Sequence, residues 1–592
     1  MKRIAGIDWK RAAGCAGAVA VLLIAATVAI WPQRRLGYSC GHDFDFHLLN
    51  WFEVLDSWKR GLFYPHWALS PNYGAGEPRF VFYPPVTWML GAALRLRTGW
   101  YFVPTDLAWI LLAGTGLATW ALARKLVPEG AATLAGCAAV FSGYSLFTAY
   151  ERSAFGELTG GFWIPLALLL ILRDRKPAAG VLGRAFDGSA FPLAVVMAGA
   201  WLSDVPLGVM ASYLLAAAAL AVAVMRRSWA PALRAAAGAI VGIGLACFYL
   251  VPATWEQKWV DVPQATNDPG SRIEASWMFA RHSDPALELH DAVLLKVSII
   301  GASMLAVTFA GLAATWLRGR VKEKRDWWIL ISIFPFAILF LQLPISVLVW
   351  NVLPKLRFLQ FPWRWFLLLE APMGIFFAAA LWPARLWRKI VIGTVCAAAF
   401  TGAALLANHI FLQPCEPEDS ISGMQEAYKA GTGFDGTDEY EPPDADDSQV
   451  PTGLPGACLV RQPTTQLAAP QPDINPDWDP AQHTCEATYL STWAAPEHLR
   501  VLADTPSAGF FVLKLRTYPA WTVTVNGRTM HQYDKREDGL MAVPVPQGAV
   551  DVEIRWTTTP DVIAGRWLSG IALLFAAALG LYEYKRSESH PR

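Results

Sequence analysis

Long apolar runs alternate with short polar connections along most of the chain, which is typical of a protein that crosses a membrane many times. The first run covers about residues 12–31, and each run holds about 20 residues, enough for a helix to cross the hydrocarbon core. The other eleven lie near residues 105–123, 130–149, 156–172, 188–204, 207–225, 232–252, 292–316, 327–347, 363–382, 389–409 and 563–582. The pattern predicts a polytopic α-helical membrane protein with about twelve transmembrane helices.

The first run has two interpretations. Basic residues precede it, as they precede the apolar part of a cleaved signal peptide. The run is long, however, and no small-x-small cleavage site comes before Pro32, so we interpret it as an uncleaved span with a cytoplasmic N-terminus. Lys or Arg occurs in every connection that this assignment places in the cytoplasm, so both termini are expected there.

The chain then divides into three parts. Residues 1–409 form the transmembrane domain, with a first outer loop at 32–103. Residues 410–560 form an extracytoplasmic insert, and residues 561–592 form the last helix and a cytoplasmic tail. Two shorter segments, about 253–291 and 348–362, also fall on the outer face.

The insert itself has two halves. From Cys415 to about Asp479 it is rich in Asp, Glu, Pro and Gly, which predicts an irregular acidic linker; no EF-hand spacing is present to favour calcium. From His498 onward, short strand-like runs follow, and Asn526-Gly527 is a strong two-residue hairpin signal. We expect a small β-sandwich, with carbohydrate binding and a structural cap both open as its role.

Composition and charge support two environments. The residues AVILMFWYC make up 54% of the 592 residues, charged residues make up only 16%, and the mean hydropathy is +0.32, so a soluble protein is excluded. The net charge of +1 excludes a broadly basic nucleic-acid binder. Residues 410–560 nevertheless hold 22 acidic and 9 basic residues, which leaves the remainder strongly basic.

The eight cysteines fall into two groups. Four lie in apolar runs, where buried thiols are ordinary. The other four, Cys40, Cys415, Cys458 and Cys485, all lie on the predicted outer face, where disulfides form. Three pairings are possible and the sequence does not choose among them. A bond from Cys40 to the insert would join the first loop to the last domain.

The first outer loop carries the densest candidate chemistry. Asp43, Asp45 and His47 follow the first span directly, and residues 48–62 have helical spacing suited to a helix lying in the membrane interface. The alternate spacing of the three side chains is compatible with a metal site, but one short cluster supplies too few ligands to specify an ion, and interfacial capping or hydrogen bonding is the favoured interpretation. A Gly- and Pro-rich stretch then contains Glu77, Arg79 and Tyr83.

Further charged residues lie near the predicted outer ends of later spans. Glu151 and Arg152 link two spans, and Asp204 lies in the break between two others. Arg357 and Arg364 lie among aromatic residues before the tenth span. Each Arg can simply extend to lipid headgroups. Together, Arg and aromatic residues at headgroup depth suit a phosphate-bearing ligand.

Several motifs are absent. The sequence contains no Walker A motif, no G-x-S-x-G and no C-x-x-C, and its cytoplasmic connections are short and basic. The substrate is therefore expected in the membrane or outside the cell.

The first loop resembles that of GT-C membrane glycosyltransferases, in its acidic motif after the first span, its helix and its Pro-Pro segment, YPPVTWML. GEPRFVFYPP, ERSAFGEL and LRFLQFPWRW also resemble bacterial membrane proteins labelled as related to 6-pyruvoyl-tetrahydropterin synthase. The chain departs from the GT-C pattern in having Asp-x-Asp rather than adjacent acidic residues, which leaves the base open between Asp43 and Asp45.

The resemblance implies a GT-C-like fold in a bacterial inner membrane and sugar transfer from a polyprenyl-phosphate donor to an extracytoplasmic glycan, lipid or protein. It implies inverting displacement with Asp43 or Asp45 as the catalytic residue. The implied donor phosphate ligands are Arg79, Arg152, Arg357 and Arg364. The implied acceptor or supporting residues are His47, Glu77, Glu151 and Tyr83. A divalent cation (Mg²⁺, Mn²⁺ or Ca²⁺) could be held by Asp43, Asp45 and His47.

Two other functions fit the pattern. A transporter or flippase for lipid-linked saccharides would explain twelve spans and Arg at headgroup depth, but it explains the long first loop poorly. A non-catalytic protein for envelope-polymer assembly would use the β-rich domain as its contact surface.

Overall fold

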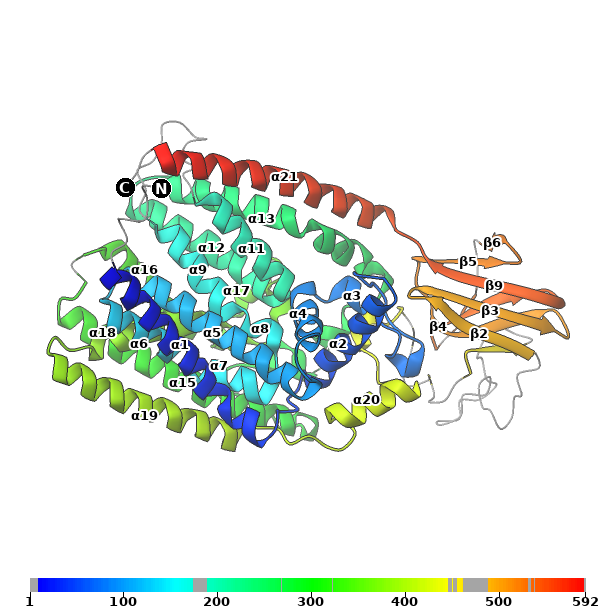
Figure 1. Ribbon diagram of the computed structural model, residues 1–592, viewed down its shortest axis with the longest axis horizontal. Coiled ribbons are helices and arrows are strands. Elements are labelled where there is room, and N and C mark those ends of the chain that lie inside the picture. The colour runs from blue at the N-terminus through cyan, green and yellow to red at the C-terminus, as the bar shows by residue number, and fades with distance from the viewer. Residues whose placement is uncertain are drawn as a thin grey trace.

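The computed structural model describes residues 9–173, 189–267, 269–321, 323–443, 445, 450, 455–460, 488–530, 534–536 and 538–589. A bundle of helices carries a β-domain at one end (Figure 1). The start and the end of the described chain both lie at the opposite end of the bundle. The predicted fold class, a polytopic α-helical membrane protein with a C-terminal β-rich domain, is confirmed.

Among the described residues, ten helical stretches are long and apolar enough to cross a membrane. Residues 325–352 form an eleventh if their bent pair of helices, 97° apart, is one span. The helices of these stretches are α1 (Trp9–Leu36), α5 (Val103–Ala123), α6 (Glu129–Val140), α7 (Gly143–Phe147), α8 (Phe155–Leu158), α9 (Gly160–Leu172), α12 (Val205–Met225), α13 (Ala230–Trp255), α15 (Glu288–Leu317), α16 (Arg325–Leu341), α17 (Val347–Val352), α18 (Glu370–Leu381), α19 (Leu386–Phe411) and α21 (Pro560–Ser589).

The remaining predicted span, near residues 188–204, holds α11 (Ala190–Ser203), a shorter apolar helix. It ends where Asp204 turns the backbone to an extended conformation and starts α12. The bent pair has a similar cause, because Pro344 follows α16 and cannot continue its hydrogen bonds. The count therefore falls below twelve where polar or proline residues interrupt apolar sequence.

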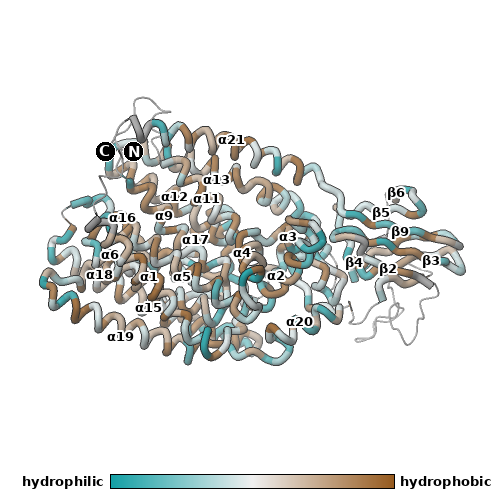
Figure 2. The backbone as a smooth tube through the Cα atoms, in the orientation of Figure 1, coloured by the Kyte–Doolittle hydropathy of each residue, from teal (hydrophilic) through white to brown (hydrophobic). Residues whose placement is uncertain are grey.

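The outer helices of the bundle present apolar side chains. Ile390 and Leu405 of α19 and Trp567 and Leu574 of α21 are all more than half exposed. Both helices run along the flanks of the bundle, and apolar residues colour much of their length (Figures 1 and 2). A surface of this kind needs lipid as its solvent.

The β-domain is a sandwich of two antiparallel sheets, with strand orders β1-β4-β8-β7 and β2-β3-β9-β5-β6. Its strands are β1 (Ala457–Val460), β2 (Thr488–Ala495), β3 (His498–Thr505), β4 (Gly509–Arg516), β5 (Trp521–Val525), β6 (Arg528–Met530), β7 (Asp534–Lys535), β8 (Leu540–Val545) and β9 (Gly548–Trp556). Phe511 and Met541 of one sheet share a core with Val501 and Ile554 of the other. The predicted hairpin is confirmed, since β5 pairs with β6 across Asn526-Gly527, both at positive φ.

The first loop lies between the bundle and the β-domain. It contains α2 (Phe44–Lys59), α3 (Arg79–Phe82) and α4 (Pro85–Arg95). Trp67 of this loop belongs to the core of the β-domain and contacts Trp521 with a ring separation of 5.2 Å. Helix α2 is buried on several sides, and its buried residues include Trp51 and Glu53. The expectation that this helix lies flat in the membrane interface is therefore wrong.

The acidic half of the insert is more ordered than its composition suggests. Helix α20 (Ile421–Ala430) begins at Ser420, whose hydroxyl accepts a hydrogen bond from the amide of Gly423. Ile421 and Met424 are buried against the bundle core. This single apolar turn is too short to stand out in a region rich in Asp, Glu, Pro and Gly.

A disulfide joins Cys40 of the first loop to Cys415 at the start of the insert. Cys458 is also disulfide-bonded, and Cys485 lies outside the described residues. The bond joins positions 375 residues apart, and nearby the amide of Ile421 in α20 donates a hydrogen bond to the hydroxyl of Tyr38 at 2.8 Å.

Replacing Cys415 by Ser should lower the thermal stability of the purified protein, because the first loop and the insert lose their covalent link. Removal of a disulfide from a folded protein costs about 2–4 kcal/mol. Melting followed by tryptophan fluorescence in detergent would measure the shift. Cys247→Ser, at a free cysteine, is the control, and an equal shift in both variants would contradict the prediction.

Candidate functional site

The first loop is anchored to the turn between α7 and α8 by main-chain contacts. The amide of His42 donates to the carbonyl of Glu151 at 3.2 Å, and the amide of Asp43 donates to the carbonyl of Arg152 at 2.9 Å. A Cβ at Gly41 would lie 2.5 Å from the Glu151 oxygen, so only glycine permits this approach. The contacts place Asp43, at the start of α2, directly beside Arg152.

Four charged side chains meet at this point: Asp43, Arg152, Glu157 and Arg364. We name them the charge cluster. Arg152 donates to Glu157, and its Nη2 lies 3.6 Å from Oδ2 of Asp43. Arg364 approaches the same Glu157 carboxylate from another element, with its Nε 3.5 Å from Oε2. The cluster therefore joins the first loop, the α7–α8 turn and the segment that leads into α18.

Local backbone geometry explains why these residues converge. Thr148–Arg152 forms a π-helical turn that ends at Ser153, which has a φ of 51°, and this turn reverses the chain before α8. Glu157 of α8 thereby faces back toward Arg152 and also accepts a hydrogen bond from the hydroxyl of Tyr144. Arg364 lies on the short helix Pro362–Leu369, which starts at a proline.

Exposure distinguishes the members of the charge cluster. The side chains of Arg152, Glu157 and Arg364 are 7%, 4% and 12% exposed, whereas that of Asp43 is 40% exposed. Two guanidinium groups share one buried carboxylate, and Nε of Arg364 makes no hydrogen bond within the described chain. Asp43 is thus the member most accessible to a substrate, and behind it the two guanidinium groups face a single buried carboxylate.

Asp204 and Tyr83 lie next to the charge cluster. Asp204 caps α12 by accepting a hydrogen bond from the amide of Leu207 at 2.9 Å, and burial raises its pKa to about 6 although Arg364 opposes the shift. The ring of Tyr83 is close enough for Asp204 and Asp43 to raise its pKa further, beyond the effect of burial. Their sequence neighbours, Phe82 and Val205, line a cavity.

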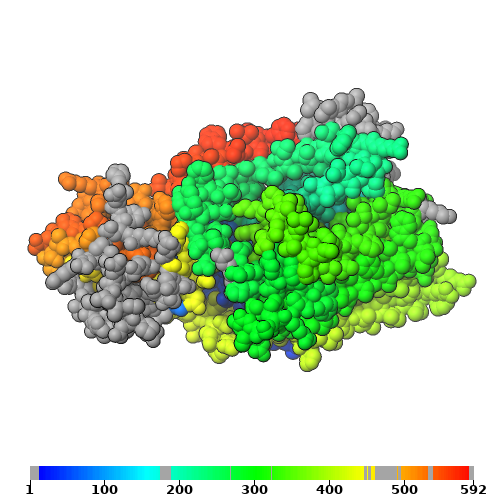
Figure 3. All heavy atoms as spheres, turned by 180° about the vertical axis from the view of Figure 1, so that it is seen from behind, coloured from blue at the N-terminus to red at the C-terminus, as the bar shows by residue number. Residues whose placement is uncertain are grey.

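An apolar cavity of about 600 Å³ opens beside Asp204 between α12 and α13. Val209, Ile243 and Leu250 line it, and Lys355 and Glu439 contribute charge. In Figure 3 the surface of this face is recessed between the green atoms near residue 250 and the lighter green atoms near residue 350. We name this space between α12 and α13 the apolar cavity.

Glu151 pairs with a residue that the sequence analysis missed. Its Oε1 lies 2.6 Å from Nζ of Lys296 on α15, and its Oε2 is buried without a hydrogen-bond partner in the described chain. Burial and the neighbouring Arg152 lower the pKa of His42. The sequence does mark Lys296 as a candidate functional residue, because it is the single charged residue inside its predicted span.

Arg79 and Glu77 form a separate buried network. Nε of Arg79 donates to Glu77 at 2.5 Å, Nη1 donates to Asn50 at 3.3 Å, and Nη2 donates to Thr437 at 3.2 Å. Its guanidinium also lies over the ring of Phe46, 4.4 Å from the centroid. These contacts occupy Arg79 within the protein and join the first loop to the insert.

The structure does not bring Arg357 into the charge cluster. Arg357 pairs with Glu274, and both side chains are 48% exposed.

Asp43, Asp45 and His47 do not share a centre that could hold a metal ion. Asp43 faces Arg152, while Asp45 is exposed. His47 is enclosed by Phe46, Tyr83 and other aromatic rings, and burial lowers its pKa to about 4. Across the described residues, no group of three His, Cys, Asp or Glu side chains is placed to bind an ion. The residues therefore do not fit the divalent cation that the spacing allowed.

No family model and no curated protein matches this sequence. Among solved structures, the Archaeoglobus fulgidus oligosaccharyltransferase in complex with zinc and sulfate is similar over 71% of this chain and 58% of that chain, with 13% identity and a TM-score of 0.43. Its apo form matches over 72% and 61%, with 12% identity and a TM-score of 0.41. The chain thus spans less than two thirds of these proteins. At this level of similarity, the function has to be inferred from the side chains of the site.

Glu157→Gln should destabilise the protein strongly, because it leaves Arg152 and Arg364 buried without their shared carboxylate. Breaking a buried ion pair costs about 3–5 kcal/mol. The melting temperature in detergent measures the effect. Glu274→Gln is the matched control, since its pair with Arg357 is exposed and such pairs contribute about 0–1 kcal/mol. Equal melting temperatures for the two variants would refute the role given to Glu157.

Proposed function

We propose that the protein is a membrane glycosyltransferase that moves a sugar from a polyprenyl-phosphate donor to an extracytoplasmic acceptor by inverting displacement. The observation that carries this proposal is the position of Asp43. It is a partly exposed carboxylate that lies 3.6 Å from a buried arginine. Tyr83 and Asp204, beside the charge cluster, are the sequence neighbours of two residues that line an apolar cavity of about 600 Å³. A base, a phosphate-binding group and a lipid-binding surface are the three parts that the reaction needs.

The donor would bind with its polyprenyl chain in the apolar cavity. The walls of this cavity are mostly aliphatic and aromatic side chains of α12 and α13, which suits a hydrocarbon chain. Val205 lines this cavity, and both arginines of the charge cluster are close enough to its neighbour Asp204 to influence its pKa, so a lipid headgroup at this end of the cavity would be near them. Arg152 and Arg364 would bind its phosphate, since guanidinium groups match phosphate oxygens.

Asp43 would act as the general base. Its carboxylate takes the proton from an acceptor hydroxyl as that oxygen attacks the anomeric carbon, and the bond from this carbon to the phosphate oxygen breaks. The leaving phosphate gains negative charge, which the two buried guanidinium groups stabilise better than water would. Lys296 and Glu151 support the backbone turn on which Arg152 lies. No step is assigned to a metal ion.

The same proposal includes the orientation of the chain. The Cys40–Cys415 disulfide lies at the end of the bundle that carries the β-domain, and disulfides persist in oxidising compartments. Basic residues such as Arg226 and Arg318 follow α12 and α15 at the opposite end. Both features favour an orientation with the β-domain outside and both termini in the cytoplasm, and the proposal places the chain in a bacterial inner membrane.

Asp43→Asn should reduce transfer by a factor of about 10²–10⁴, because an amide cannot accept the proton of the attacking hydroxyl. Release of polyprenyl phosphate from a polyprenyl-phosphate sugar measures turnover. Asp504→Asn, at an exposed position on β3, is the control for loss of one acidic residue. Normal turnover in Asp43→Asn, with normal folding, would remove Asp43 from this role.

Ile243→Trp should raise the KM for a long-chain donor roughly tenfold, because the larger ring fills part of the apolar cavity. A donor with a short prenyl chain should be affected less. Ile240 lies one turn earlier on α13, is 72% exposed and does not line the cavity. Ile240→Trp is therefore the matched control. Identical kinetics for the unmodified protein and both variants with the long-chain donor would place the lipid elsewhere.

A further inference from the structure

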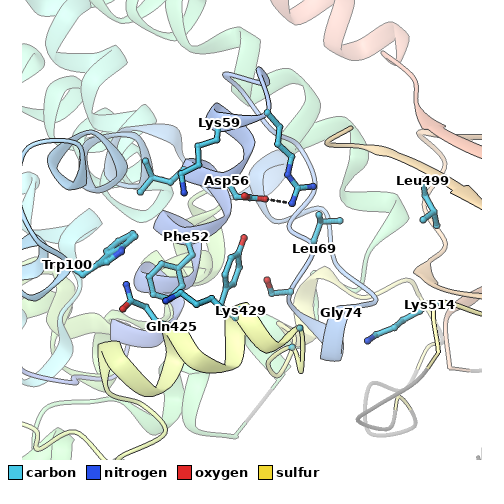
Figure 4. A pocket seen from close by; sticks show the side chains of 17 residues that line it. Phe52, Asp56, Lys59, Leu69, Gly74, Trp100, Gln425, Lys429, Leu499 and Lys514 are labelled. Carbon is cyan, nitrogen blue, oxygen red and sulfur yellow. Dashed lines mark ion pairs between the residues drawn. The ribbon is translucent and has the colours of Figure 1, made fainter. Parts of the chain in front are cut away.

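A second cavity, of about 560 Å³, lies between α2, α20 and the β-domain. We name it the basic cavity because four of its lining residues are cationic and one is acidic. They are Lys59, Arg60, Lys429, Lys514 and Asp56. Asp56 pairs with Arg60 at 2.6 Å, so the one carboxylate is already engaged. Figure 4 shows the lysines spread along the cavity, with Lys514 beside Gly74 and Lys59 beyond Asp56, and the ion pair of Asp56 dashed.

The three lysines have no ion-pair partner within the described part of the chain. Lys514 is half-buried, and burial lowers its pKa. A Cβ at Gly74 would lie 2.9 Å from Nζ of Lys514, so the glycine leaves room for this ammonium group. A partly buried ammonium group without a counter-ion is stabilised when an anion binds beside it.

Aromatic rings line the same space. Phe52 contacts Trp100 and Tyr428, with ring centroids 4.6 Å and 5.4 Å apart. Gln425 and Ser70 add hydrogen-bonding groups. Aromatic faces pack against the C–H faces of sugar rings, and polar side chains bind their hydroxyl groups. Cations, aromatic rings and amide or hydroxyl groups together match a saccharide that carries carboxylates.

Helix α2 connects the basic cavity to the charge cluster. Phe52, Asp56 and Lys59 follow helical spacing on one face of α2, and Asp45 lies on the same face seven residues before Phe52. A rise of 1.5 Å per residue places Phe52 about 13 Å along the helix from Asp43. Asp419, just before α20, is close enough to influence Asp45, so α20 begins beside the start of α2. A chain held in the basic cavity can therefore extend along this face of α2 to Asp45, at the end of the helix where Asp43 also lies.

We propose that the basic cavity binds the acceptor, and that this acceptor is an anionic oligosaccharide containing uronic acids. Lys59, Lys429 and Lys514 bind its carboxylates, while Trp100 and Tyr428 pack against its rings. The role of the saccharide as acceptor rests on the proposed function, whereas the binding of a saccharide rests only on the residues of the basic cavity.

Titration of the full-length protein with hexagalacturonate, in nanodiscs of zwitterionic lipid, tests the site. We expect binding that weakens as salt is raised, and none with the uncharged maltohexaose. Lys514→Gln should weaken binding about fivefold, and the triple variant with Lys59→Gln and Lys429→Gln roughly thirtyfold. Lys429 is exposed, so Lys429→Gln alone gives a reading even if the Lys514 variant fails to fold.

Arg528→Gln is the matched control, because it removes an exposed cation from the same β-domain outside the basic cavity. Equal weakening in Arg528→Gln and Lys514→Gln would overturn the proposal, as would equal binding of hexagalacturonate and maltohexaose. Loss of hexagalacturonate binding when phosphatidylglycerol is added to the nanodiscs would also overturn it, since the site would then hold a lipid headgroup.

The two proposals fail differently. Asp43→Asn should keep hexagalacturonate binding while it loses transfer. Binding that depends on the lysines, without any transfer from a polyprenyl-phosphate sugar, would reject the transferase and retain the saccharide site. Transfer that proceeds normally in the triple lysine variant, with unchanged binding, would reject the basic cavity and retain the transferase.

Discussion

The shared carboxylate of Glu157 is the interaction on which the arrangement of this protein most depends. Arg152 and Arg364 come from distant parts of the chain, and each would be an uncompensated buried charge without it. The same pairing fixes the turn whose carbonyl groups hold the first loop at His42 and Asp43. A local electrostatic requirement thereby sets where α2 begins, and α2 in turn borders both the charge cluster and the basic cavity.

Much of the fold could be predicted because the underlying signals are local. Apolar runs of about 20 residues mark the spans, and Asn526-Gly527 marks a hairpin that the positive φ of both residues explains. The shortfalls have local causes too. Asp204 ends α11 early, and α20 depends on one capped turn with two buried apolar residues, a pattern that an acidic region hides.

The site could be predicted only in part, because its geometry depends on contacts far apart in sequence. Asp43 and Arg152 were both identified as candidates from their place at span ends, and the structure brings them together. Nothing in the spacing distinguishes Arg364, which approaches Glu157, from Arg357, which pairs with Glu274 at the surface. Arg79 is a similar case, since the network that engages it includes Thr437, about 360 residues away.

The insert affects the site as well as the surface. Disulfide Cys40–Cys415 fixes its start beside the first loop, Thr437 hydrogen-bonds to Glu77, and Tyr428 packs on Phe52 of α2. These contacts hold the first loop from the side opposite the bundle. Helix α2 is therefore packed between the bundle and the insert and does not lie on lipid. The start of α2 lies beside the buried Arg152, and the contacts with the insert hold the rest of the helix. The basic cavity lies between α2, α20 and the β-domain, so the same contacts that hold α2 in place also form the walls of this cavity.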